Sequence, residues 1–143
     1  TSNMKKLLLA FAIASASLVT LNSCTKEYIT NYLPGISYAT NVTPNQWKLV
    51  SGSTNIYYAE LNFPELDNQY YESGTVQVAL EFKDAAGYYN AIPATIKNVR
   101  YSFDYTVGYV TVFAEVLPGG NTNAIDKDMK AKITLTDADN GGS

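Results

Sequence analysis

The sequence predicts an all-β domain, an antiparallel β-sandwich (immunoglobulin-like or similar) of seven to nine strands. From Ile36 onward, apolar and polar residues alternate with the period of two that is typical of half-buried strands. Gly, Pro, Asn and Asp interrupt the alternation about every 8–12 residues, as in sandwich domains. No window has the i, i+3, i+4 apolar spacing of an amphipathic helix. A small β-barrel is the alternative closure of the same pattern.

Four strands are predicted in the first half of this domain: 36–42, 47–50, 56–63 and 75–83. The alternation is clearest in the fourth, which would place Val76, Val78, Leu80 and Phe82 on one face. Pro64 should end the third strand, because proline cannot donate a ladder hydrogen bond. Residues 64–74 then form a long connection without predicted secondary structure.

Five strands are predicted in the second half: 88–91, 94–96, 100–107, 109–116 and 129–136. The turn at 84–87 should make a hairpin between 75–83 and 88–91. Pro93 restricts 94–96 to a sheet edge or a strand start. Gly108 predicts a hairpin between 100–107 and 109–116. A second long connection, 117–128, precedes the last strand, and the domain 36–137 is followed by a polar tail, 138–143.

The N-terminal segment has the layout of a bacterial secretory signal. Lys5 and Lys6 precede an apolar run of 15 residues, 7–21, which is shorter than the ~20 residues that a membrane-spanning helix needs. The run ends in Leu21, Asn22, Ser23 and Cys24 rather than in an A-x-A cleavage site. We interpret these four residues as a lipobox. Leu21, Asn22 and Ser23 would be recognised by the signal peptidase, residues 4–23 would be removed, and Cys24 would carry the lipid.

A lipid on Cys24 would make the protein a membrane-anchored lipoprotein of the cell envelope. Each buried CH₂ contributes about 0.8 kcal/mol, so two or three acyl chains would hold it essentially permanently. Residues 24–35 would be the tether, and the 11 residues after Cys24 reach at most about 35–40 Å when extended. We therefore expect the domain to remain next to the membrane.

Composition excludes several functions. Without Lys5 and Lys6 the chain has eight basic and 13 acidic residues, so it lacks the clustered positive charge of nucleic-acid-binding proteins. Cys24 is the only cysteine, which precludes an internal disulfide. The absence of histidine excludes Ser-His-Asp and Cys-His catalysis and imidazole ligands for zinc. We expect no cofactor and no enzymatic activity, and a small hydrolase is the least favoured alternative because no carboxylate pair stands out.

The 12 tyrosines are the most unusual feature of the composition. Most fall within strand patterns, where tyrosine packs well against neighbouring strands. Tyr70 and Tyr71, in the connection 64–74, and Tyr88 and Tyr89, beside a predicted turn, are the candidates for contact with a glycan or a protein partner. Trp47, the single tryptophan, is expected in the core.

Acidic residues near the C-terminus provide a weak calcium motif. Asp137 and Asp139 resemble the opening of a calcium loop, but Gly141 stands at its fifth position and no twelfth residue follows. Asp126 and Asp128 could join them in an oxygen-ligand site. A solvated tail is the simpler interpretation.

Several segments resemble a group of short Bacteroidota outer-membrane and surface lipoproteins: TPNQWKLV, IYYAELNFPEL, SGTVQVALEF, AIPATI and YSFDYTVGYVTVF. The resemblance covers most of 36–136 and implies a lineage and a β-sandwich, but no activity. Many such lipoproteins carry a short Lys and acidic export signal after the cysteine. Lys26 and Glu27 match this signal in part, although Tyr28 replaces the further acid. The partial match favours surface display over the periplasmic face. The expectation is an accessory or interaction module, with a glycan-binding lipoprotein as the alternative.

Overall fold

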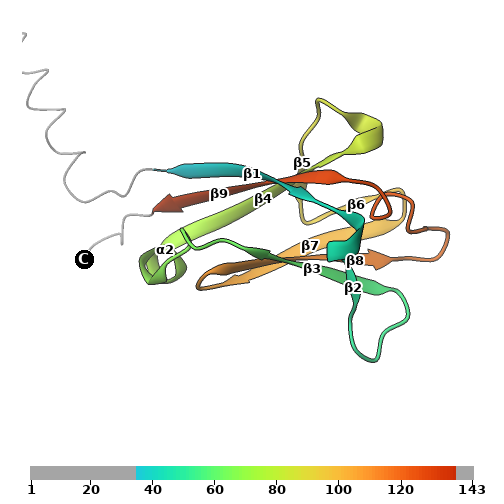
Figure 1. The fold of residues 1–143 in the computed structure, drawn as a ribbon, viewed down its shortest axis with the longest axis horizontal. Coiled ribbons are helices and arrows are strands. Elements are labelled where there is room, and N and C mark those ends of the chain that lie inside the picture. Colours follow the sequence, from blue (N-terminus) through green and yellow to red (C-terminus); the bar gives the residue numbers. More distant parts are fainter. Residues whose placement is uncertain (1–34, 138–143) are drawn as a thin grey trace, which may run out of the picture. The chain divides into compact units, whose positions relative to one another are not determined.

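The computed structural model describes residues 35–137, and two antiparallel sheets account for most of them (Figure 1). Sheet A contains, in spatial order, β1 (Ile36–Val42), β9 (Met129–Asp137), β4 (Gly74–Phe82) and β5 (Asn90–Ile92). Sheet B contains β2 (Lys48–Leu49), β3 (Ile56–Asn62), β8 (Tyr109–Val116), β7 (Val99–Thr106) and β6 (Ala94–Ile96). Neither sheet closes on itself. The fold is therefore the predicted all-β sandwich rather than the alternative barrel.

The chain crosses between the sheets at both lateral edges. The short 3₁₀ helix η1 (Pro44–Gln46) links edge strand β1 to edge strand β2. On the other side, Pro93 alone separates β5 from β6, which are also edge strands. Both positions that the prediction allowed for Pro93 are found, because β6 is an edge strand and begins directly after this proline.

The core lies between the sheets and follows the predicted alternation. In β4, Val76, Val78, Leu80 and Phe82 are all buried. The predicted hairpin of β7 and β8 is confirmed, with Thr106 paired to Tyr109 across Gly108. The remaining strands contribute inward-facing residues that include Ala59, Leu61, Tyr101, Val110, Val112, Ala131, Ile133 and Leu135. Burial also raises the pKa of Tyr101 to about 12, so this phenol is neutral at physiological pH.

Strand β1 departs from the predicted pattern of burial. Its alternation would place Tyr38 and Thr40 inward, but only Val42 is buried and Ile36 partly so. The strand pairs with β9 and has no partner on its other side. Tyr38, at 46% exposure, packs edge-to-face against Phe63 with ring centroids 5.5 Å apart. An edge position therefore explains why alternation and burial differ here.

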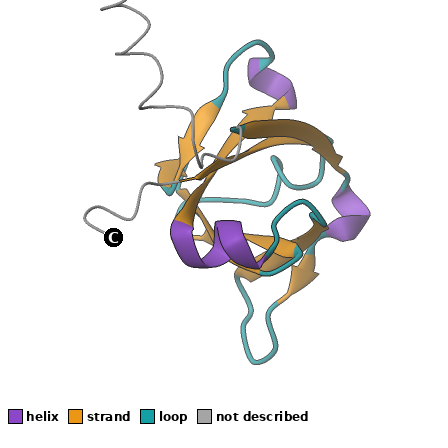
Figure 2. Cartoon of the chain, turned by 90° about the vertical axis from the view of Figure 1, so that its left-hand side faces the viewer, coloured by secondary structure: helices purple, strands orange, loops and turns teal. Residues whose placement is uncertain are grey.

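The connection 64–74 contains a helix that the sequence pattern does not predict. Helix α2 (Asn68–Ser73) begins after Asp67, whose Oδ1 accepts a hydrogen bond from the Tyr70 N–H at 3.1 Å. Such an N-cap satisfies one of the free N–H groups of the first turn. The helix covers one end of the sandwich, the end that faces the viewer in Figure 2. Residues 64–74 thus connect β3 to β4 as predicted, but the connection contains a short helix that the sequence analysis did not include.

Candidate functional site

The four tyrosines predicted to contact a ligand do not form one site. Tyr70 is buried, with 3% of its surface exposed, so the prediction of an exposed Tyr70–Tyr71 pair was wrong. Burial raises the pKa of Tyr70, as do the nearby charges of Asp137 and Asp67. Tyr71 is 45% exposed and packs edge-to-face on Tyr105, with centroids 6.3 Å apart. One tyrosine of the pair is therefore part of the core, and only the other faces solvent.

Tyr88 and Tyr89 lie at the far end of β4 from α2. They are 72% and 39% exposed, in the loop that follows η2 (Lys83–Ala85). The ammonium of Lys132 lies 4.7 Å from the centroid of the Tyr89 ring, a cation–π contact on the outer side of sheet A. The nine residues of β4 span roughly 27 Å. Tyr70 and Tyr71 therefore precede one end of β4, and Tyr88 and Tyr89 follow the other.

The acidic residues of the predicted calcium site are also separated. Asp126 and Asp128 precede β9 and Asp137 ends it, so a strand of nine residues, roughly 27 Å long, lies between them. Asp126 accepts a hydrogen bond from Thr122 Oγ1 at 2.9 Å, and Asp139 lies outside the described residues. Within 35–137, no three His, Cys, Asp or Glu side chains are placed to hold a metal ion.

Leu21, Asn22, Ser23 and Cys24 lie outside the described residues, so the lipobox stays a prediction. In the described part of the chain, no helix is long and apolar enough to cross a membrane.

A polar recess lies on the outer side of sheet B, where η1 meets β2 and β3. Its volume is about 370 Å³. Its lining is mainly polar and provides amide, ammonium, phenol and carboxylate groups, from Asn45, Gln46, Lys48, Tyr58 and Glu60. This set of donors and acceptors around one aromatic ring is the type of lining that orients a hydroxyl-rich ligand.

Local hydrogen bonds orient the two amides of the recess. The backbone N–H of Thr43 donates to Gln46 Oε1 at 2.8 Å, while the Thr43 hydroxyl donates to Gln46 Oε1 and to Asn45 Oδ1. This is a capping box around η1. Because the amide oxygens accept these bonds, the NH₂ groups of Asn45 and Gln46 keep their donor capacity for a ligand.

Sheet register places the other groups of the recess. Lys48 is paired with Tyr58 across β2 and β3, and Tyr58 with Phe113 across β3 and β8. Tyr58 and Phe113 are half-buried and stand on the outer face, where directly opposite aromatic side chains pack against each other. Within residues 35–137, the side chains of Lys48, Tyr58 and Glu60 form no hydrogen bond or ion pair with other side chains. Their polar atoms are therefore available to a ligand.

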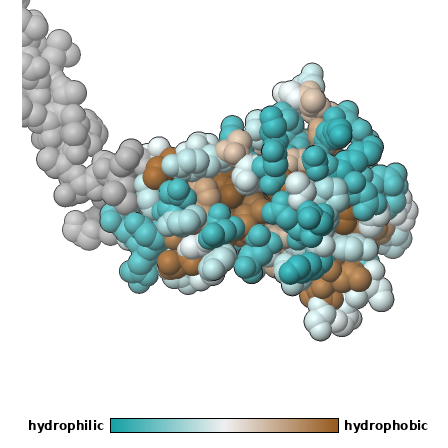
Figure 3. All heavy atoms as spheres, viewed as in Figure 1, coloured by the Kyte–Doolittle hydropathy of each residue, from teal (hydrophilic) through white to brown (hydrophobic). Residues whose placement is uncertain are grey.

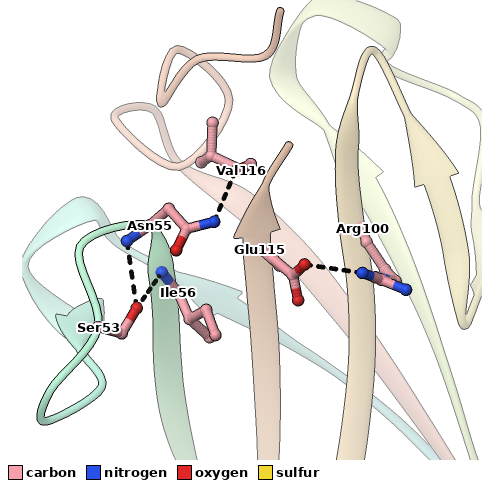
Figure 4. A network of polar contacts seen from close by, with 6 residues as sticks. All are labelled: Ser53, Asn55, Ile56, Arg100, Glu115 and Val116. Atoms are coloured by element: carbon pink, nitrogen blue, oxygen red, sulfur yellow. Dashed lines mark hydrogen bonds and ion pairs between the residues drawn. The ribbon is translucent and has the colours of Figure 1, made fainter. Parts of the chain in front are cut away.

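The hairpin that carries β2 is fixed to its neighbours (Figure 4). Ser53 Oγ accepts hydrogen bonds from the N–H groups of Asn55 and Ile56, at 3.1 and 2.8 Å. Asn55 Nδ2 donates to the Val116 carbonyl at 2.9 Å, which ties the turn to β8. The hairpin also exposes Leu49, at 49%. Figure 3 shows apolar surface at the position of the β2–β3 hairpin. These bonds hold one wall of the recess in place.

Trp47 lies between two residues that line the recess. It is partly buried and packs against the core, as predicted. Its indole Nε1 is buried and has no hydrogen-bond partner in the described residues. An unpaired buried donor costs about 1–3 kcal/mol. Because Trp47 is the only tryptophan and adjoins Gln46 and Lys48, its fluorescence is a natural reporter on the recess.

No known protein family matches the chain, and comparisons with curated proteins and with solved structures found no match. The resemblance to Bacteroidota lipoproteins therefore stays a prediction. The sequence offered one local signal for the recess, the T-x-x-Q spacing of Thr43 and Gln46. It offered none for the approach of η1 to Tyr58, which depends on the pairing of β2 with β3.

Proposed function

We propose that the protein is a non-catalytic, lipid-anchored lipoprotein of the cell envelope that presents this sandwich as an accessory or interaction module at the outer membrane. The supporting observation is Cys24 directly after Leu21, Asn22 and Ser23, at the end of an apolar run that follows two lysines. The first strand begins at Ile36, 12 residues after that cysteine. A module attached this way would operate within about 40 Å of the bilayer.

A Cys24→Ser variant tests the anchor. Cells fed with labelled palmitate are expected to incorporate label into the wild-type protein and to retain it in the outer-membrane fraction. The variant should incorporate none, because serine lacks the thiol that takes the lipid. Ser23→Ala, which keeps a small residue before the cysteine, is the matched control and should be labelled. Label on the Cys24→Ser variant, or none on the wild type, would contradict the proposal.

A second candidate function is glycan binding, which the polar recess favours. Tyr58 offers an aromatic face, and Asn45, Gln46, Lys48 and Glu60 surround it with donors and an acceptor. Sugars present both apolar C–H faces and hydroxyl groups, so a ring beside mixed polar groups suits them. The recess is a candidate location for such an activity in addition to the exposed Tyr71, Tyr88 and Tyr89, whereas Tyr70 is buried.

A glycan array with two tyrosine variants tests this candidate. Tyr58→Ala is expected to weaken binding to any captured glycan by about tenfold or more, since one stacked aromatic contributes on the order of 1.4 kcal/mol. Tyr88→Ala removes an equally large but more exposed ring far from the recess and should leave binding unchanged. Titration with the captured glycan, followed by quenching of Trp47 fluorescence, should rank the affinities of the two variants in the same order. An array without binding, or equal losses in both variants, would end this candidate.

A further inference from the structure

A pocket lies at the end of the sandwich opposite α2. Three connections meet there: η2 after β4, the β6–β7 turn, and residues 117–128 before β9. The volume of the pocket is about 130 Å³. Its inner lining is apolar and consists of Phe82, Ile96 and Ala124, which are buried or half-buried against the core. Its outer lining is charged and consists of exposed Lys83, Asp84, Lys97 and Lys127.

Direct bonds tie the three connections into one ring. The Leu117 N–H donates to the Asn98 carbonyl at 2.9 Å, which joins residues 117–128 to the β6–β7 turn. Lys127 Nζ pairs with Asp84 Oδ2 at 2.8 Å, which joins the same segment to η2. The side chain of Ile125, 5% exposed, anchors the segment in the core. The walls of the pocket are therefore held in place before any ligand binds, which reduces the cost of ordering them.

The rim carries an excess of positive charge. Three ammonium groups face a single carboxylate, that of Asp84, and only Lys127 is paired with it. The hydrogen bond and charge of Lys127 lower the pKa of Asp84, and the charges of Lys97 and Lys83 lower it further. All three lysines thus lie near one carboxylate, while the whole chain has a net charge of −3. Such a local inversion of charge attracts anions.

We propose that this pocket binds a small organic acid, with its carboxylate at the lysine rim and its apolar part against Phe82, Ile96 and Ala124. The volume sets the size of the apolar part. An apolar cavity of about 150 Å³ accommodates one benzene ring, so about 130 Å³ suits a chain or ring of about six carbon atoms. The lysines require that the ligand carry a negative charge. Its carboxylate would bind Lys83 and Lys97, because these two lysines have no ion-pair partner within residues 35–137.

Titration of the full chain carrying Cys24→Ser, followed by amide NMR, tests the site independently of the lipid anchor. Hexanoate is expected to shift the amide signals of Ile96, Lys97 and Ala124. It should bind about tenfold more tightly than acetate, which lacks the apolar part, or 1-hexanol, which lacks the charge. No shift of these signals, or equal binding of hexanoate and either control compound, would overturn the proposal.

Two variants locate the ligand at this pocket. Lys97→Gln removes one unpaired ammonium and should weaken hexanoate binding about fivefold or more, at low salt, where the charge is least screened. Lys130→Gln makes the same change at an exposed lysine of β9 that does not line the pocket, and it should bind as the parent does. Ala124→Leu keeps every charge but occupies the apolar space, so it should also weaken binding. Equal affinity of the Lys97→Gln and Lys130→Gln variants, or unchanged binding by Ala124→Leu, would contradict the assignment.

Discussion

Replacement of Tyr70 by alanine is expected to lower the free energy of unfolding by about 3–5 kcal/mol, the cost of removing a buried aromatic side chain. Tyr70 is 3% exposed on α2, and its own N–H donates the capping hydrogen bond to Asp67 Oδ1. Its loss would open a cavity at the end of the sandwich that α2 covers. Since small domains are stable by only about 5–15 kcal/mol, this variant would approach the limit of folding.

Tyr71→Ala is the matched control, one residue further along the same helix. Tyr71 is 45% exposed and contacts Tyr105 only at the surface, so its loss should change the free energy of unfolding by about 0.5 kcal/mol or less. Urea denaturation followed by circular dichroism measures both values. Equal losses in the two variants would show that Tyr70 is not the core residue of this pair. If Tyr70 and Tyr71 were both replaced by alanine, a loss of ligand binding could come from unfolding as well as from a lost contact. The two residues must therefore be tested separately.

Ile133→Ala should be the second strongly destabilising change, at about 2–5 kcal/mol. Ile133 is fully buried at the centre of β9. Ile133 is paired with Tyr38 of β1 on one side and with Val78 of β4 on the other. A cavity at Ile133 would therefore loosen the packing of the whole of sheet A. Neighbouring residues could not move far enough to fill this cavity, because the strands on both sides hold the backbone in register. Most of the cost should therefore remain.

Gln77→Ala is the control on the neighbouring strand. Gln77 is exposed on the outer face of β4, so this variant should unfold within about 0.5 kcal/mol of the parent. The midpoints and slopes of urea curves give the comparison, and an unchanged slope would assign the difference to the folded state. A small loss for Ile133→Ala would mean that sheet A lacks the packing described above.

Strand positions were the most predictable part of the fold. Alternation along β4 and β9 reports directly which side chains face the core, because each strand is buried on one face only. Hence Leu80 and Ile133 could be assigned inward from the sequence alone. Pro93 was equally informative, since its missing N–H leaves few places in a sheet. Boundaries differed by one or two residues, as at β5, which begins at Asn90 rather than Tyr88.

Features that depend on tertiary contacts were not predictable in the same way. Helix α2 has only six residues, too few to show a helical period, so the burial of Tyr70 was missed. The Asp67 cap was its one visible signal. In β1 the alternation was present, but its place at the edge of sheet A left Tyr38 exposed. The local sequence of β1 contains no signal that this strand lies at an edge.

The two pockets show the same limit. The polar recess needs Tyr58 beside η1, and the lysine-rimmed pocket needs Lys83, Lys97 and Lys127 from three separate connections. Apart from the T-x-x-Q spacing of Thr43 and Gln46, no spacing along the chain indicates either group. The tyrosine pairs were conspicuous in the sequence because they are adjacent, but adjacent residues on α2 face different directions. Both candidate pockets are formed by residues that the fold brings together, not by residues that are adjacent in the sequence.

The intact mass of the protein purified from membranes tests the central proposal, attachment through Cys24, most directly. The expected mass is that of the chain from Cys24 onward plus a diacylglycerol on the thiol, with or without a further acyl chain on the new amino group. Digestion should place the whole addition on the peptide that begins with Cys24. A mass that still includes residues 4–23, or an unmodified Cys24 in the membrane-bound protein, would contradict it.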